Sequence, residues 1–111
     1  MEKHLQEYNL FHVHDKENAS GRKGVTIGIK KNRIEIENIE MKTDQGEEEE
    51  GRWIRVTLNK MLDKQLNIWG IYAPTNTNNR KKWLRELGRE IRQTNNGYRM
   101  IAGDFNFIMN I

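Results

Sequence analysis

An acid and an amide lie two residues apart near the end of the sequence, directly after an apolar run. The run covers residues 100–103 and ends in Gly103, and Asp104 and Asn106 follow it with Phe105 between them. Residues at i and i+2 of an extended chain point to the same side, so Asp104 and Asn106 are expected to project together. A carboxylate and a carboxamide at the end of a strand can hold a water molecule, a metal ion or a phosphate oxygen. We therefore take this pair as the first candidate site.

A second polar segment follows an earlier apolar run. Residues 66–73 have apolar side chains on both faces, as expected for a central strand covered on each side, and Pro74 ends the run. Tyr72 and Asn76 lie at this end. If the two strands are neighbours, their carboxyl ends converge, and ligands of α/β sheets bind at such ends. The Tyr72 hydroxyl, the Asn76 amide and the Asp104 carboxylate are then expected to meet in one place.

Structural roles remain open for the same residues. A tyrosine can pack in a core with a bonded hydroxyl, and Asp-x-Asn after a strand can cap a turn. His12 and His14 are predicted to share one strand face, but no third ligand stands at a suitable spacing, which favours a partly exposed pair over a metal site. The run Glu47–Glu50 is interpreted as the solvated tip of a hairpin. The basic clusters 30–33 and 79–82 suit either phosphate contacts or solvated turns.

The elements that position these residues are predicted from periodicity. A helix is predicted from about Asn79 to Gln93, with an apolar inner face, a basic outer face and an N-cap at position 77, 78 or 79. A further strand is predicted across 34–41, with a phase slip near Asn38. The remaining strands are predicted at Tyr8–His14, Gly24–Lys30, Arg52–Asn59, 66–73 and Arg99–Phe105. Hairpins in the first half and a strand–helix–strand crossover in the second half indicate an α/β domain with a mixed sheet and a helix on one face.

Composition narrows the class of protein. The chain has 111 residues, of which 35% are hydrophobic and 32% charged, which allows one domain with a modest core. It contains no cysteine, which excludes a disulfide framework and a thiolate zinc site. The net charge of +3 and the pI near 9.3 permit a nucleic-acid partner without requiring one. No apolar run approaches the ~20 residues of a membrane span. We expect the protein to be located inside the cell, in the nucleus or elsewhere.

At residues 69–74 (Trp-Gly-Ile-Tyr-Ala-Pro) and 101–106 (Ile-Ala-Gly-Asp-Phe-Asn) the chain resembles the endonuclease/exonuclease/phosphatase superfamily. Within it, the sequence is most similar to the apurinic-endonuclease-like nuclease domain of LINE-type retrotransposons. That family has a strand ending in Tyr-Ala-Pro, an amphipathic helix and a strand ending in Gly-Asp-Phe-Asn. Residues 24–29 also resemble a family strand that follows a basic loop. The resemblance implies a two-sheet α/β sandwich, here incomplete, with a largely antiparallel mixed sheet and one main helix.

The resemblance also implies a function and roles for individual residues. It implies hydrolysis of a phosphodiester or phosphomonoester with Mg²⁺, and in this branch DNA is the expected substrate. Asp104 matches the aspartate that orients or deprotonates the attacking water, Asn106 the asparagine that positions it, and Tyr72 the tyrosine that contacts the phosphate. Asp104 and Asn106 are the expected metal ligands, and Asn76 and Arg80 are expected to contact the substrate.

Two parts of the family pattern have no counterpart in residues 1–111. One is a strand carrying a metal-binding glutamate, which comes early in the family's domain, and the other is a Ser-Asp-His motif with an essential histidine. We therefore expect a single partial domain that is inactive in this form. Two alternatives remain open: a non-catalytic nucleic-acid-binding module that uses the basic turns with Arg85, Arg89 and Arg92, and a phosphatase of the same superfamily that acts on a phosphorylated lipid or small molecule.

Overall fold

Two β-sheets and one α-helix make up the part of the chain that the structure, a computed structural model, describes: residues 7–14, 24–44, 51–94 and 96–105. One sheet has two antiparallel strands, β1 and β2, and the other has the order β3-β4-β5-β6. Strands β3, β4 and β5 are antiparallel, whereas β5 and β6 are parallel and are connected by the helix α2. The elements are β1 (Tyr8–His14), β2 (Gly24–Lys30), the 3₁₀ turn η1 (Ile36–Asn38), β3 (Ile39–Thr43), β4 (Trp53–Leu58), β5 (Leu66–Tyr72), α2 (Thr77–Gln93) and β6 (Tyr98–Asp104).

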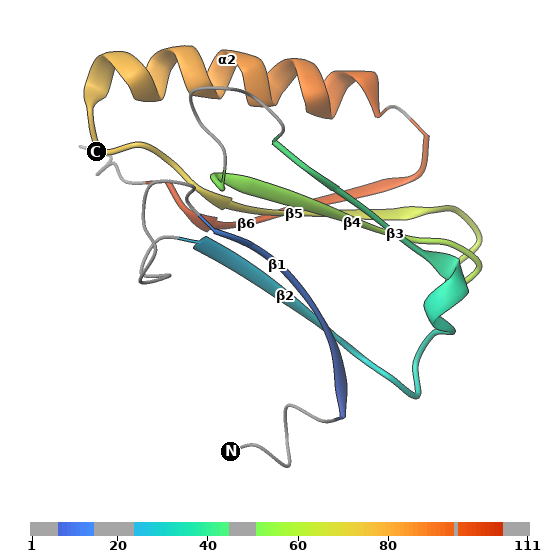
Figure 1. The fold of residues 1–111 in the computed structure, drawn as a ribbon. Coiled ribbons are helices and arrows are strands. Elements are labelled where there is room, and N and C mark those ends of the chain that lie inside the picture. Colours follow the sequence, from blue (N-terminus) through green and yellow to red (C-terminus); the bar gives the residue numbers. More distant parts are fainter. Residues whose placement is uncertain (1–6, 15–23, 45–50, 95, 106–111) are drawn as a thin grey trace, which may run out of the picture.

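The three parts stack as layers, with α2 on one face of the four-stranded sheet and the β1–β2 sheet on the other (Figure 1). The sequence of β4 explains why this sheet is covered twice. Trp53 packs on the helix side, whereas Ile54, Val56 and Leu58 belong to the cluster between the two sheets. Alternate residues of a strand face opposite sides, so an apolar residue on each side requires a cover on each side.

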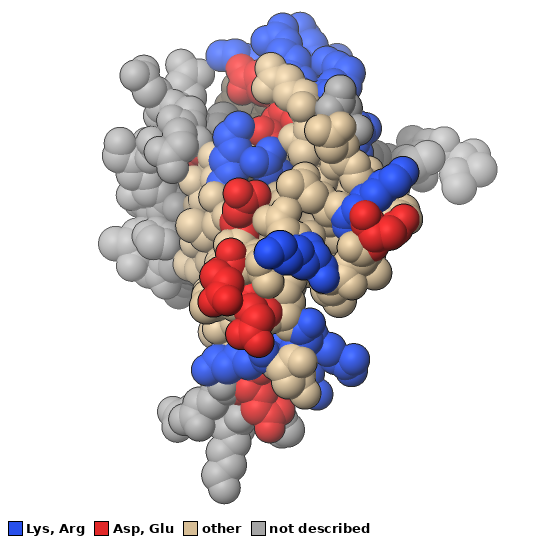
Figure 2. Space-filling model, turned by 90° about the vertical axis from the view of Figure 1, so that its right-hand side faces the viewer, with Lys and Arg blue, Asp and Glu red and all other residues tan. Residues whose placement is uncertain are grey.

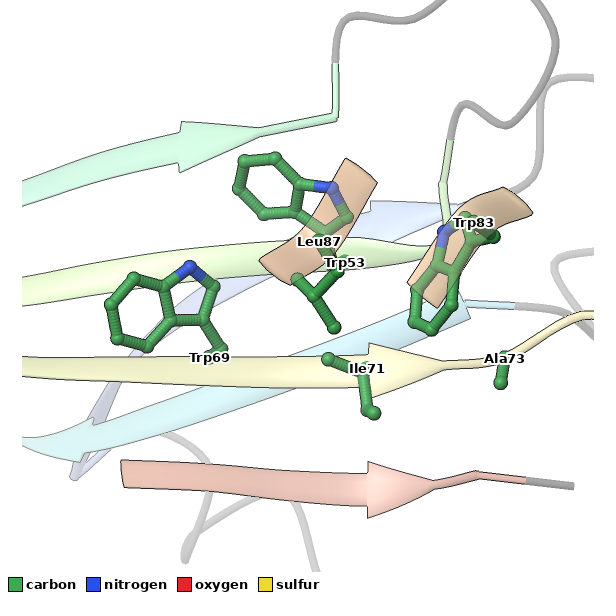
Figure 3. Close-up of a cluster of buried hydrophobic side chains, with 6 residues drawn as sticks. All are labelled: Trp53, Trp69, Ile71, Ala73, Trp83 and Leu87. Atoms are coloured by element: carbon green, nitrogen blue, oxygen red, sulfur yellow. The ribbon is translucent and has the colours of Figure 1, made fainter. Parts of the chain in front are cut away.

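Three tryptophans belong to the cluster between α2 and the sheet, and Leu87 lies between Trp69 and Trp83 (Figure 3). Trp83 and Leu87 come from the helix, and alternate residues of β5 face them from the sheet. Burying large aromatic side chains removes about 150–250 Å² each from water, so this cluster contributes much of the stabilisation of α2 on the sheet. Its buried members are Trp53, Trp69, Ile71, Ala73, Trp83 and Leu87.

The β1–β2 sheet packs closely on β5 because one residue of β5 has no side chain. A Cβ atom at Gly70 would lie 2.5 Å from Val25 Cγ1, which is closer than packed atoms approach. Phe11 and Val13 of β1 and Ile27 of β2 complete the contact with the four-stranded sheet. The glycine therefore sets how near the two sheets come to each other.

A buried carboxylate also holds α2 on the sheet. Glu90 is only 7% exposed, and its two oxygens accept hydrogen bonds from Lys42 Nζ (2.7 Å) and Arg55 Nη1 (2.9 Å). Trp69 Nε1 donates to the same carboxylate at 3.4 Å. Two cations and a ring N–H compensate for the loss of water around this acid. No local sequence pattern predicts this contact, because the partners come from three separate strands.

Several predicted boundaries need correction. The helix begins at Thr77 rather than near Asn79, since Asn76 is its N-cap. The strand predicted across residues 34–41 begins only at Ile39, and the phase slip near Asn38 is the 3₁₀ turn η1. The predicted hairpin tip, Glu47–Glu50, lies outside the described residues. The inner face of the helix, the antiparallel hairpins and the crossover are confirmed.

Among the described residues, no helix has the length and the hydropathy of a membrane-spanning segment.

Candidate functional site

Tyr72 and Asp104 are the last residues of two neighbouring parallel strands, and the structure pairs them in register. Paired residues of adjacent strands point to the same face of a sheet, so both side chains lie on one side. That side faces the β1–β2 sheet, because Gly70, two residues before Tyr72, contacts Val25. The pairing continues one residue further, where the Ala73 N–H donates to the Asp104 carbonyl oxygen at 2.8 Å.

Gly103 allows Asp104 to stand this close to β5. It has a φ of +142°, and a Cβ atom there would lie 2.1 Å from the Ile71 carbonyl oxygen. The contact is with backbone, which cannot turn aside as a flexible side chain can. Only glycine fits this conformation and this spacing without moving β6. The Gly-Asp pair of the sequence therefore has a geometric reason at this position.

Arg52 lies at the same end of the sheet and was not among the predicted site residues. Its guanidinium carbon lies 5.3 Å from the centre of the Tyr72 ring, which is a cation–π contact. The Tyr72 N–H also donates to the Arg52 carbonyl oxygen at 2.7 Å. The antiparallel pairing of Trp53 with Ile71 places Arg52, the residue before β4, beside the end of β5. The structure shows this register, and no sequence pattern indicates it.

The buried carboxylate of Asp44 holds the backbone at Gly51 and Arg52 in place. The two oxygens of its side chain accept hydrogen bonds from the backbone N–H groups of Gly51 and Arg52, each at 2.9 Å. Asp44 is 8% exposed, and burial raises the pKa of its carboxyl from 3.8 to about 6, although the backbone hydrogen bonds oppose this shift. Asp44 thus binds the backbone at the start of β4 and fixes the position from which the Arg52 side chain extends.

Asn76 and Arg80, the two residues predicted to contact substrate, lie in the segment that follows β5. Asn76 Oδ1 accepts hydrogen bonds from the backbone N–H groups of Asn78 (3.0 Å) and Asn79 (3.1 Å), as a helix N-cap does. The Arg80 guanidinium donates to the Thr75 carbonyl oxygen at 3.2 Å. Because the Asn76 oxygen serves the helix, a substrate contact by this residue would have to use its amide nitrogen.

Asn106, the second residue of the opening pair, lies outside the described residues, and so do the side chains of His4 and His14. His12 is exposed, and its ring is hydrogen-bonded to the Thr26 hydroxyl on β2. Phe11 and Val13 face the four-stranded sheet, so His12 lies on the outer side of β1 and away from Tyr72 and Asp104. Within the part of the chain that the structure describes, no three acidic or histidine side chains converge on a common point.

The arrangement offers three chemical functions at one sheet edge. Asp104 is exposed and has a carboxylate that accepts protons or binds a cation, the Tyr72 hydroxyl can donate a hydrogen bond, and Arg52 carries a permanent positive charge. A phosphate group needs donors and positive charge, and attack on it needs a base for the incoming water. Comparison of the chain with family models, with curated proteins and with solved structures found no match.

Proposed function

We propose that this chain is part of a metal-dependent phosphodiesterase domain of the endonuclease/exonuclease/phosphatase type, most like the DNA endonuclease of LINE-type retrotransposons. The stacking of a helix, a mixed four-stranded sheet and a second sheet supports the sandwich architecture of that type. The observation that carries the proposal is the register of Tyr72 with Asp104. It brings the two strand-end motifs to one edge, with both side chains on one face.

In this proposal each residue acts on a phosphodiester placed at the ends of β5 and β6. Asp104 orients a water molecule and takes its proton as the water attacks phosphorus, and the opposite P–O bond breaks to release an alkoxide that takes up a proton. The Tyr72 hydroxyl donates a hydrogen bond to a non-bridging oxygen, and this bond strengthens as negative charge grows in the transition state. Arg52, held by Asp44 and stacked on Tyr72, adds positive charge beside the same oxygens. DNA is the proposed substrate because the motifs most resemble those of the retrotransposon branch.

Mg²⁺ is the metal that suits this site. It is bound in many enzymes through one or two carboxylates, several waters and the phosphate of the substrate, so the single carboxylate of Asp104 is a suitable donor. Asn106 is proposed as the second protein ligand. The bound ion would neutralise charge that develops on the phosphate.

The activity is proposed to depend on groups outside the described residues. Asp104 supplies one carboxylate, and His12 lies away from the site. The described residues of the site therefore provide no second acid to protonate the leaving group. Because the metal-binding glutamate and the Ser-Asp-His motif of the retrotransposon nucleases have no counterpart in residues 1–111, we propose that cleavage requires further protein sequence. The 111 residues alone are expected to cleave slowly or not at all.

The test is Mg²⁺-dependent nicking of supercoiled plasmid by the chain extended with its flanking coding sequence. Removing the base, Asp104→Asn, should reduce the rate by about 10²–10⁴-fold. Removing one hydrogen bond to a charged oxygen, Tyr72→Phe, should reduce it by about 10–100-fold. EDTA should abolish nicking in the unmodified protein.

The chain provides a matched control at the opposite end of the same sheet. Tyr98 begins β6, and its hydroxyl donates to Asp63 at 2.9 Å. Tyr98→Phe and Asp63→Asn make the same chemical changes away from the proposed site, and they should leave the nicking rate within about twofold. Equal nicking by Asp104→Asn and Asp63→Asn would disprove the catalytic assignment of Asp104.

A further inference from the structure

The outer surface of α2 concentrates the positive charge of the molecule. Residues 77–93 contain six Lys or Arg and two Glu, a formal charge of +4, whereas the whole chain carries +3. The rest of the chain is therefore close to neutral. Glu90 is turned inward and already paired with Lys42 and Arg55, so Glu86 is the acid of the helix that stays on its exposed surface.

The charges are arranged as a row. Lys82, Arg85, Arg89 and Arg92 are spaced by three and four residues, so they share one face of the helix and extend over about 15 Å. We call these four residues the α2 basic row. All four are exposed, and an open depression of about 340 Å³ is lined by Lys82, Arg85, Glu86 and Arg89. Figure 2 shows Lys and Arg side chains gathered over α2 at the top of the molecule.

The three arginines of this row have no internal role in the described structure. Among the residues that the structure describes, Arg85, Arg89 and Arg92 form no hydrogen bond and no ion pair. By contrast, Arg55 pairs with Glu90, and Arg52 stacks on Tyr72. Adjacent like charges at three- and four-residue spacing repel one another, so a bound anion would relieve the repulsion among the three arginines.

From these observations we infer that the α2 basic row binds the phosphate backbone of a nucleic-acid duplex, on a surface separate from the strand-end site. Guanidinium groups pair with phosphates in a forked geometry. About 15 Å of duplex axis carries about nine phosphate charges, which is more than enough to engage the row. Tyr72 and Asp104 lie on the face of the sheet turned away from α2, so the α2 basic row is on a different side of the molecule from the strand-end site.

Two other polyanions fit the surface less well. An amphipathic helix binds an anionic membrane by inserting apolar side chains, but those of α2 pack against the sheet: Trp83, Leu84, Leu87 and Ile91. Single-stranded nucleic acid is bound largely by stacking of bases on exposed aromatic rings. The aromatic residue of α2, Trp83, is 2% exposed and turned inward. Backbone contact with a duplex needs neither insertion nor stacking.

The test is binding of the whole 111-residue chain to a fluorescent 30-base-pair DNA duplex in EDTA over a range of salt concentrations. The triple variant Arg85→Ala, Arg89→Ala, Arg92→Ala should bind at least about tenfold more weakly. Its slope of log K against log salt should be smaller in magnitude by about 2.7, which corresponds to three lost phosphate contacts. Circular dichroism should show an unchanged helix, because these side chains are exposed and unpaired in the described structure.

A control with the same loss of charge comes from exposed loops. Lys60→Asn together with Lys64→Glu lowers the net charge by the same three units away from α2 and should leave duplex affinity within about threefold. Equal weakening by the helix variant and this loop variant would mean that only net charge matters, which would overturn the inference. Unchanged duplex binding by the helix variant, together with lost binding to phosphatidylserine vesicles, would also overturn it.

The same assay separates this inference from the proposed function. Introduced into the Asp104→Asn protein, the three helix substitutions should weaken duplex binding in EDTA by the same factor of about ten or more, because the α2 basic row is on the other side of the sheet. Loss of nicking in Asp104→Asn together with this weakening supports both assignments. No weakening by the helix substitutions in the Asp104→Asn protein would refute a separate surface, whatever the nicking result.

Discussion

The neighbouring strands β5 and β6 each provide one residue of the proposed site, but they are held very differently. β5 has β4 and β6 on its two edges and is covered on both faces, and its centre is buried. Every residue of β6 is exposed, and within the described residues no strand pairs with its outer edge. Met100 and Ile101 point to opposite faces and are 53% and 41% exposed. Tyr72 thus stands on a rigid strand, whereas the position of Asp104 depends on how β6 attaches to β5.

An open edge with apolar residues on both faces has a known consequence. Unpaired backbone groups and exposed apolar side chains promote pairing with other chains. Bound partners or further residues of a longer protein would cover this edge if the chain is part of a larger domain, as proposed. The difference in packing between β5 and β6 can be tested by matched substitutions on the two strands.

The largest expected difference is between Trp69 and Ile101, which are paired in register on the helix side of the sheet. Trp69 is fully buried, so Trp69→Ala should lower the free energy of unfolding by about 3–5 kcal/mol. Ile101→Ala removes a side chain that is already largely in water and should cost less than about 1 kcal/mol. Urea unfolding monitored by far-ultraviolet circular dichroism, which does not rely on Trp69 fluorescence, measures both losses of stability. Equal losses would show that β6 is packed as firmly as β5.

A smaller effect is expected at Gly103, where the two strands touch. Gly103→Ala places a methyl group against the Ile71 backbone and should cost about 1–3 kcal/mol, because β6 must move away from β5. Hydrogen exchange should then show lost protection in β6 and retained protection in β5. Gly28→Ala is the control, since its nearest contact is the flexible Leu10 side chain at 3.3 Å, and it should stay within about 1 kcal/mol of the wild type. Uniform loss of protection in both strands would contradict separate holding of β6.

The smallest expected effect is that of Asp44, whose carboxylate binds the backbone of Arg52 beside the end of β5. This effect depends on pH. The pKa of Asp44 is raised from 3.8 to about 6 in the folded chain. Its contribution to stability is therefore fully present below pH 3.8 and is lost as the pH rises through 6. Wild type should gain about 1 kcal/mol relative to Asp44→Asn between pH 7.5 and pH 5, a value reduced from the full shift to allow for solvent screening. Parallel pH profiles of the two proteins in urea unfolding would show that this carboxyl is solvated.

Local sequence patterns were sufficient for most of the elements. Strands β1 and β2 have the predicted bounds, and the apolar residues of α2 face the sheet as their spacing predicts. Errors arose where local chemistry competed with periodicity. The helix begins earlier than predicted because the Asn76 side chain accepts hydrogen bonds from two backbone N–H groups and so acts as the N-cap. The isoleucines near Asn38 form a 3₁₀ turn, which the period-2 pattern does not distinguish from a strand.

The candidate site divides in the same way. The sequence identified Tyr72 and Asp104 from their places at strand ends, and the crossover rule predicted that these ends are neighbours. It did not identify Arg52, Asp44 or Glu90, whose partners are distant in the chain. No local pattern marks such residues, because the strand register that unites them arises from pairing across the sheet.

By itself, the sequence determined which segments are strands and helix, which faces are apolar, and where polar residues follow the strands. These are properties of a few consecutive residues, set by side-chain periodicity and by glycine and proline. The tertiary structure alone decided that β1 and β2 form a separate sheet, that β6 is an exposed edge, and that Arg52 stacks on Tyr72. Those outcomes depend on how far-apart segments pair and which surfaces they bury, and that choice is made by the free energy of the whole assembly.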